Sequence, residues 1–495
     1  MMNAECGIMS EELKSTDYPM RAVPDRPKPR TALILCLLLS AVACPACSIT
    51  VPSQHIVMFN GLGNPIDPSE NFFGKHLSYV PGVTYDQLDN NQYDQQLEKV
   101  LNALLTHPLD KHGKRRVLMF IHGGNNTATE AIKRAAVLKG RIADAGYFPI
   151  FVNWEASLMT SYFDHLFNVR QGRQTFRWCC NDQAEPSTNA TITGAVVGTL
   201  TAPFYLATDL SRGVLLAPPT WYTMLFKRDQ ASALTDTSFP EPGHISISRG
   251  ADARSKSEQF FAYLDNLNPV KLPASMIVEA GGTGAWDNLV RRTRLLFHRE
   301  PDLAAPAAFK HFLNRLLKEM PEPDRSAWDL TIVAHSMGTI IANQILRDFP
   351  ELPIGKIVYM AAACSIRDYQ DTLFPYLRDR NKTAELYHLM LHPEAEEEER
   401  SVGSFAPDGS LLVWIDEFLS NPSTPLDLTA GRFTNLLPVL RLTPDQIRAR
   451  VHVKVFGAGE DLLPSQPQTH GGFDEPEFWN EQGFWASVGQ PEPHP

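Results

Sequence analysis

An apolar run that ends at a serine and continues as a helical pattern lies in the second half of the chain. Residues 330–343 read LTIVAHSMGTIIAN, and the five residues centred on Ser336, AHSMG, differ by one residue from the motif G-x-S-x-G. Small residues two positions before and after the serine let a strand and a helix approach closely, and the turn between them exposes the serine hydroxyl. The segment therefore predicts a strand, a tight turn and a helix, with Ser336 as a candidate nucleophile. A simple helix cap is the alternative interpretation of this serine.

Two more segments carry features that a serine nucleophile requires. Residues 116–126 read RVLMFIHGGNN, a strand that ends in His-Gly-Gly, and residues 451–473 read VHVKVFGAGEDLLPSQPQTHGGF, a strand followed by a loop with His470. Backbone N–H groups of a glycine loop can stabilise an oxyanion, and a histidine can act as the general base. An exposed loop histidine is the alternative for His470. His122 and His335 lie inside the motifs, so we expect them to orient loops by hydrogen bonding.

The order of these segments resembles that of serine esterases and lipases of the α/β-hydrolase superfamily. The resemblance covers residues 117–154 and 328–473. It implies an α/β fold in which a mostly parallel sheet carries helices on both faces, with a large insertion before the nucleophile strand. For the site it implies the following residues: Ser336 as nucleophile, His470 as base, and an oxyanion hole made by the N–H of Met337 and that of Gly124 or Asn125.

Several carboxylates could be the acid of the triad. A carboxylate must hold the imidazole in the correct tautomer, and the resemblance places it after either of two late strands. Asp368 follows the first of these strands, Glu394 lies three residues past the second, and Asp461 is a third alternative. We favour Asp368 over Glu394, because residues 396–399 after Glu394 are all glutamate and indicate a solvated helix start.

The N-terminal region has the layout of a secretory signal peptide. Residues 21–30 contain four basic residues and one acidic one, residues 31–40 are mostly apolar, and Ala-Val-Ala precedes Cys44. The apolar stretch is short for a membrane span, which needs about 20 residues. We therefore expect an exported protein, periplasmic or membrane-anchored. The position of Cys44 also resembles a bacterial lipoprotein acylation site, and a plain signal peptide or an uncleaved anchor is the alternative.

The composition of the chain limits which nucleic acids, cofactors or metals we expect it to bind. The 495 residues carry a formal net charge of -11, which argues against a nucleic-acid partner. No Walker-type loop, dinucleotide fingerprint or metal-spaced Cys/His set occurs, so we expect no cofactor and no metal. Seven cysteines are present, of which Cys179 and Cys180 are adjacent, and their connectivity cannot be deduced.

An apolar segment interrupts the alternation of predicted strands and helices. Residues 191–208 contain no charged residue, and residues 213–226 are a second apolar piece. Burial is the default expectation, and a lid or a surface that contacts lipid are the alternatives. Residues 229–300 are polar and rich in Gly, Ser and Asp, which predicts loops and short helices.

The pattern divides the chain into five parts. We predict a tail with signal or anchor segment at 1–48, the first part of the hydrolase domain at 49–154, an insertion at 155–300, the second part of the domain at 301–485, and a tail at 486–495. Strands are expected at 53–60, 117–121, 148–154, from 330, and at 357–362, 385–391 and 451–456. Helices are expected at 93–107, 127–145, 303–320, 411–419 and 444–450.

The predicted activity is that of an exported serine hydrolase that cleaves carboxylic esters. The expected substrate is a small-molecule ester or a lipid or acyl ester, with contact to a membrane surface as a further expectation. An acyltransferase or amidase with the same triad is one alternative. A non-catalytic surface protein that keeps the fold for binding is the other, because fold does not fix function.

Overall fold

The computed structural model describes most of the chain after the N-terminal region. The described residues are 52–68, 88–170, 172–175, 188–226, 245–247, 271–299, 306–321, 324–399, 406–456 and 467–475. The predicted signal segment, Cys44, the pair Cys179 and Cys180, and Asp461 lie outside them. Cys364 is described, and its thiol is buried.

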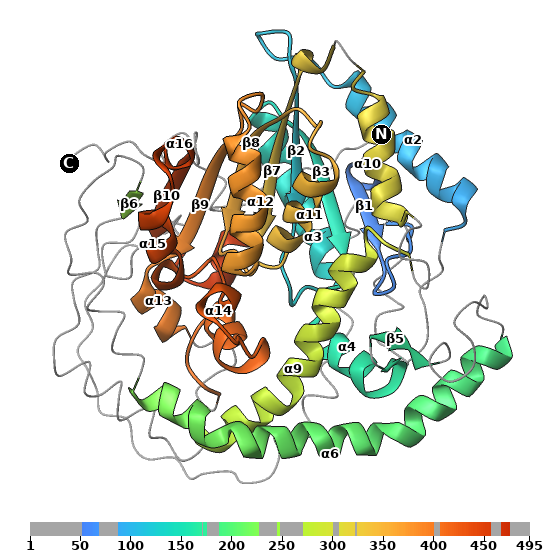
Figure 1. Ribbon diagram of the computed structural model, residues 1–495. Coiled ribbons are helices and arrows are strands. Elements are labelled where there is room, and N and C mark those ends of the chain that lie inside the picture. Colours follow the sequence, from blue (N-terminus) through green and yellow to red (C-terminus); the bar gives the residue numbers. More distant parts are fainter. Residues whose placement is uncertain are drawn as a thin grey trace, which may run out of the picture. The chain divides into compact units, whose positions relative to one another are not determined.

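A parallel sheet of eight strands forms the centre of the structure (Figure 1). Its strand order is β1-β3-β2-β7-β8-β9-β10-β6, and every pair of neighbours is parallel. The predicted α/β fold with a parallel sheet is therefore confirmed. The strands are β1 (Ile56–Phe59), β2 (Arg115–Ile121), β3 (Phe148–Trp154), β6 (Ile245–Ile247), β7 (Trp328–His335), β8 (Ile354–Met360), β9 (Glu385–Leu391) and β10 (Val451–Phe456).

Helices cover the sheet. Strand β3 is buried along its whole length, as expected for a parallel sheet that is covered on both faces. In Figure 1, α11 and α12 lie in front of the central strands. The helices are α2 (Asn90–Thr106), α3 (Ala128–Asp144), α4 (Leu158–Phe163), α6 (Thr188–Phe226), α9 (Lys271–Leu295), α10 (Ala308–Lys318), α11 (Gly338–Asp348), α12 (Ile366–Arg378), α13 (Pro393–Glu398), α14 (Leu411–Trp414), α15 (Phe433–Leu442) and α16 (Asp445–Arg448).

Helix α9 corrects the prediction for residues 229–300. The sequence predicts loops and short helices there, but α9 is a helix of 25 residues, and Ile245–Ile247 form strand β6, which pairs with β10 in the sheet. Its glycines lower helix propensity, yet they let neighbouring side chains approach the helix backbone. A Cβ on Gly282 would lie 2.1 Å from a methyl carbon of Leu419, and one on Gly284 would lie 2.6 Å from the ring of His165. Tertiary packing therefore outweighs propensity in this helix.

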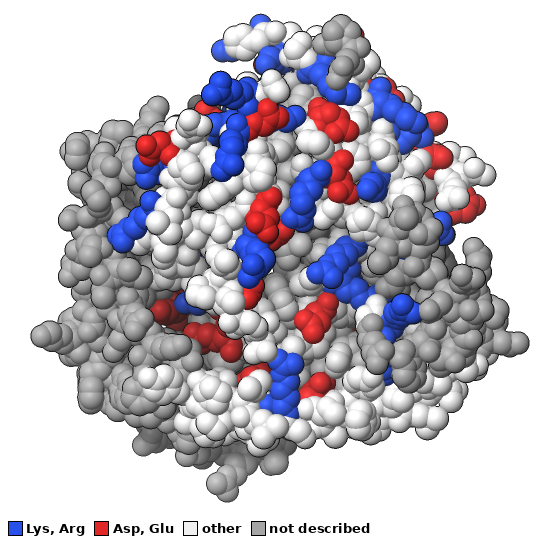
Figure 2. Space-filling model, viewed as in Figure 1, with Lys and Arg blue, Asp and Glu red and all other residues white. Residues whose placement is uncertain are grey.

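Helix α6 exposes apolar side chains, so the default expectation of burial is wrong for its outer face. Figure 2 shows few charged side chains along the lower edge of the described surface, where α6 lies. Of the side chains on which the lipid alternative depends, Leu216 and Trp221 are half-buried. The exposed apolar residues of α6 include Ile192, Val196, Leu200, Phe204, Leu206, Leu210, Val214, Leu215 and Tyr222.

The one acidic residue of α6, Asp209, turns toward the protein. Its carboxylate accepts hydrogen bonds from the hydroxyl of Tyr162 and the ring Nε2 of His165, both at 3.2 Å. The outer face of the helix therefore carries no carboxylate. Among the described residues, no helix combines the length and the apolar character needed to cross a membrane.

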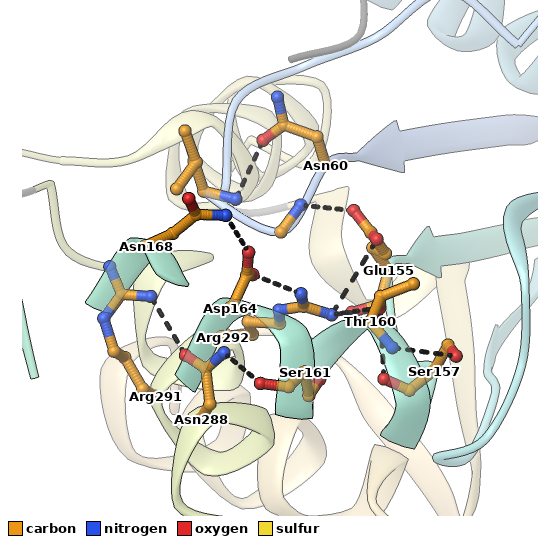
Figure 3. Close-up of polar contacts among 12 residues, drawn as sticks. Asn60, Glu155, Ser157, Thr160, Ser161, Asp164, Asn168, Asn288, Arg291 and Arg292 are labelled. Carbon is orange, nitrogen blue, oxygen red and sulfur yellow. Dashed lines mark hydrogen bonds and ion pairs between the residues drawn. The ribbon is translucent and has the colours of Figure 1, made fainter. Parts of the chain in front are cut away.

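A buried arginine fastens α9 to the carboxyl ends of the strands (Figure 3). Arg292 donates from Nη1 to the backbone oxygen of Glu155 at 3.2 Å, directly after β3, and from Nη2 to Asp164 Oδ2 at 2.5 Å. Glu155 in turn accepts a hydrogen bond of 3.1 Å from the N–H of Gly61, which follows β1. Because Arg292 is 2% exposed, its charge is compensated by these groups and not by water. This network positions the α9 layer over the same sheet edge at which β7 ends.

We predict that Arg292→Met lowers the free energy of unfolding by about 3–5 kcal/mol, because it leaves the carboxylates of Glu155 and Asp164 without their cation. Urea unfolding followed by circular dichroism measures the loss. Arg294→Met is the matched control, since Arg294 lies on the same helix and is exposed. Equal losses in the two variants would contradict the role of this network.

Candidate functional site

The serine turn, residues 334–338, joins β7 to α11 as predicted. Ser336 has a backbone φ of 49°, in the left-handed region that side chains other than glycine rarely adopt. Such a conformation costs about 1–3 kcal/mol and persists only where surrounding contacts enforce it. Here the Ser336 N–H donates to the carbonyl of Met360 at 2.8 Å, and the Ser336 carbonyl accepts from the N–H of Ala363 at 3.1 Å. The strand and the helix also need Gly338, whose added Cβ would lie 2.4 Å from the carbonyl oxygen of Ile121.

The side chain of Ser336 is buried and caps nothing. The N-cap residue of α11 is Met337, without a side-chain hydrogen bond, so the helix-cap interpretation of Ser336 is wrong. The exposed hydroxyl that the motif predicts is not observed either, because Ser336 is 0% exposed. Its Oγ has no hydrogen-bond partner among the described residues. A buried hydroxyl without a partner costs about 1–3 kcal/mol, so this group requires a functional explanation.

The glycine loop, residues 122–125, lies directly against the serine turn. A Cβ on Gly123 would be 2.7 Å from the Cβ of Ser336, and one on Gly124 would be 2.9 Å from the sulfur of Met337. The structure therefore brings the predicted oxyanion segment to the predicted nucleophile. The N–H of Met337 lies at a helix N-terminus, where backbone donors have no partner within the helix.

One predicted oxyanion donor is used elsewhere. The N–H of Asn125 donates to the carbonyl of Ala156 at 2.6 Å, which removes it from the oxyanion position. The prediction of Asn125 as a donor is therefore wrong, and Gly124 is the donor of the loop that remains a candidate beside Met337.

His122 orients the glycine loop, as expected. Its Nε2 accepts from the N–H of Trp154 at 3.1 Å, so the ring hydrogen is on Nδ1, which donates to the carbonyl of Gly123 at 2.8 Å. The ring also stacks on the indole of Trp154, with centroids 5.9 Å apart. Burial lowers the pKa of His122 to about 4, so the ring is neutral.

His470 comes to the same place from the C-terminal part of the chain. It begins the short helix η7 (His470–Asp474), and it is buried, so the alternative of an exposed loop histidine is wrong. Its ring centroid is 4.9 Å from that of His335, and its backbone N–H donates to Glu399 Oε2 at 2.7 Å. Burial, followed by the charge of His335, lowers the pKa of His470 to about 3, so the ring is neutral and is a weaker base than a free imidazole. Neither ring nitrogen has a hydrogen-bond partner among the described residues.

Asp368, the favoured acid, does not join this site. It lies in the first turn of α12, where its carboxylate accepts from Asn343 Nδ2 at 2.6 Å and from Arg347 Nη1 at 2.5 Å. Both partners are on α11, so the carboxylate fastens one helix to the next. The prediction of Asp368 as the partner of His470 is therefore not supported by the structure.

The segment after β9 also differs from its prediction. Glu394 lies in α13, and its side chain is outside the described residues. Glu396, expected in a solvated helix start, is 1% exposed and accepts a hydrogen bond from the hydroxyl of Ser410. Burial raises the pKa of Glu396 to about 8. The run of glutamates predicts a solvated helix start, which is wrong for Glu396 because α13 packs against α14.

Asp474 is the carboxylate that the sequence reasoning missed. Its Oδ2 lies 2.9 Å from Nδ1 of His335 and 3.2 Å from Nη2 of Arg134. Burial alone would raise the pKa of Asp474, but the charges of His335 and Arg134 hold it below its usual range. Arg134 also donates to Asn126 Oδ1 at 2.9 Å. The spacing in HGGFD, four residues after His470, was the available signal.

A search for metal sites and comparisons with known proteins bear on the identity of the site. Among the described residues, no group of three or more His, Cys, Asp or Glu side chains is arranged to hold a metal ion. Comparison with known protein families, with curated proteins and with solved structures finds no match to this chain. The chemistry of the site therefore has to be inferred from its own geometry.

We predict that Gly123→Ala lowers the free energy of unfolding by about 1–3 kcal/mol, since the added methyl overlaps Ser336. Urea unfolding measures this loss. Gly140→Ala is the control, because a Cβ at that position in α3 meets nothing within 4 Å and should stabilise the helix by about 0.5–1 kcal/mol. A neutral Gly123→Ala would show that the loop does not need to lie so close to the serine.

Proposed function

We propose that the chain is a serine hydrolase that cleaves carboxylic esters through an acyl-enzyme. The observation that carries this proposal is Ser336, a buried hydroxyl without a hydrogen-bond partner among the described residues, on a turn with φ of 49° that lies against the glycine loop. Backbone donors at the start of α11, and the neutral His470 whose ring lies against that of the preceding residue His335, supply the other parts that acyl transfer requires. The parallel sheet with a strand, turn and helix at Ser336 supports an α/β-hydrolase fold, with residues 155–300 as an insertion.

The proposed reaction uses groups of this chain only. Ser336 Oγ attacks the carbonyl carbon of the ester, and its proton passes to a ring nitrogen of His470. The N–H groups of Met337 and Gly124 stabilise the oxyanion. His470 then gives the proton to the leaving alcohol. In the second step His470 takes a proton from water as the water oxygen attacks the acyl carbon, and it returns this proton to Ser336 Oγ when the carboxylic acid leaves. Because Ser336 is 0% exposed, substrate entry requires that the residues covering it move.

The apolar face of α6 supports lipid or acyl esters as substrates. An open groove of about 540 Å3 on this helix is lined by Phe204, Leu215 and Leu216 among others, and its residues include Arg212 and Asn421. Exposed apolar surface of this kind is typical of contact with lipid or with a partner. Export of the protein, to the periplasm or to a membrane anchor with Cys44 as the acylation site, rests on the layout of residues 21–44.

Two other functions use the same features. An acyltransferase or amidase would keep the serine and histidine and differ in the acceptor or the leaving group. A binding protein without catalysis would keep the fold. The strained turn at Ser336, whose Oγ has no partner among the described residues, disfavours it, and the lack of a carboxylate bound to the His470 ring among those residues favours it.

We predict that Ser336→Ala lowers the hydrolysis of p-nitrophenyl acetate by roughly 1,000-fold or more, since the covalent route disappears. His470→Gln should lose a similar factor, because the two residues act as a unit. Ser326→Ala is the matched control, because Ser326 is an exposed serine in the same part of the chain. Normal rates for the folded Ser336→Ala protein would exclude this residue as nucleophile, and normal rates for His470→Gln would point to another base.

Lipid contact predicts a difference between substrates. Leu200→Glu and Leu215→Glu should lower hydrolysis of emulsified p-nitrophenyl palmitate by roughly 10-fold, because each removes about 1.5–3 kcal/mol of apolar contact. Hydrolysis of the acetate ester should not change. Leu442→Glu is the control, since Leu442 is 85% exposed on α15 and Leu215 is 77% exposed on α6. Equal losses on both esters would indicate damaged folding, and no loss on either would exclude α6 from substrate contact.

A further inference from the structure

Each of the two ring nitrogens of His335 lies close to an oxygen atom. Nε2 makes a hydrogen bond of 3.1 Å with the backbone carbonyl oxygen of His470, and Nδ1 lies at ion-pair distance, 2.9 Å, from the Oδ2 of Asp474 without the alignment of a hydrogen bond. All three residues are buried, with His335 3% exposed and Asp474 7% exposed. Bulk water therefore has little access to the ring or to the carboxylate.

The two contacts fix the hydrogens of the ring. A carbonyl oxygen only accepts, so the Nε2 of His335 donates to His470. A neutral imidazole would then carry a lone pair on Nδ1, which would face the ionised carboxylate of Asp474 at 2.9 Å. This arrangement is repulsive in a buried place, where electrostatic interactions are strong. With a hydrogen on each nitrogen, both contacts become attractive.

We propose that His335 is an imidazolium ion that positions His470 beside the serine turn, with Asp474 as its counter-ion. His335 directly precedes Ser336, so a bond from its ring to the backbone of His470 ties the proposed base to the backbone of the proposed nucleophile. His335 is a positioning residue, because it acts through His470. The part that concerns catalysis rests on the proposed function.

The same cation sets the charge around the base. The charged and titratable groups that face His335 are Asp474 and His470 from η7, His122 from the glycine loop, and Arg134 from α3 through Asp474. A fixed positive charge whose ring centroid is 4.9 Å from that of His470 disfavours a second proton on His470. The cation therefore keeps the base neutral, while Asp474 balances the charge of the cation itself.

Nitrogen-15 NMR of the full chain labelled in its histidines tests the protonation state directly. The His335 signals are those that disappear in His335→Gln or His335→Asn. At pH about 7.5, where a free imidazole is mostly neutral, we expect both His335 nitrogens to be of the protonated type in the wild-type protein. Asp474→Asn should convert one of them to the unprotonated type. One unprotonated His335 nitrogen in the wild-type protein would overturn the proposal. This measurement needs no catalysis, so its failure is distinct from inactivity of Ser336.

The pH dependence of kcat/KM tests the role in catalysis. His335→Gln keeps a donor but removes the charge, so kcat should fall by roughly 100-fold as His470 loses its position. The acidic limb of the profile should move to higher pH, because His470 gains a proton more readily without the cation and with Asp474 left as an anion. His112→Gln is the matched control, because His112 is an exposed histidine outside the site, and it should change neither quantity. A slower His335→Gln enzyme with an unmoved acidic limb would reduce His335 to a structural role and overturn the proposal.

Discussion

The carboxylate of Asp474 joins the segments on which the candidate site depends. It contacts His335 at the end of β7 and Arg134 on α3, and its own helix, η7, carries His470. Arg134 binds Asn126, whose amide donates to the carbonyls of Gly123 and Gly124 at 3.1 Å. Buried charges of this kind are stable only when they are paired and hydrogen-bonded, so the three segments must come together for any of them to be buried.

A second buried charge, Arg292, has a corresponding role for the outer layer. It holds α9 at the carboxyl ends of β1 and β3, and α9 in turn packs on α6. The serine turn follows the carboxyl end of β7 in the same sheet. Parallel α/β sheets bind their ligands at this edge, because loops from several strands converge there. The polar centre around Asp474 and the apolar face of α6 therefore both lie toward the carboxyl ends of the strands. For the proposed function, these two features together favour an ester with an apolar part.

The sequence predicted the sheet well because buried parallel strands appear as short apolar runs, and β3, β9 and β10 have the predicted bounds. It failed for α9, whose glycines are explained only by contacts with Leu419 and His165, far away in the sequence. The meeting of the serine turn with the glycine loop could be predicted because both have local motifs, and the arrival of His470 beside them followed from its position after the last strand. The carboxylates could not be assigned, because the partners of Asp368 and Asp474 lie far away in the sequence: Asn343 for Asp368, and His335 and Arg134 for Asp474.

The central claim is that Ser336 is an acyl-accepting nucleophile, and the site of covalent modification tests it most directly. The full-length protein is treated with a fluorophosphonate, digested and examined by mass spectrometry for the modified peptide. We predict a single adduct on Ser336, the proposed nucleophile. An adduct on a different residue, or no adduct on a folded protein, would contradict the account.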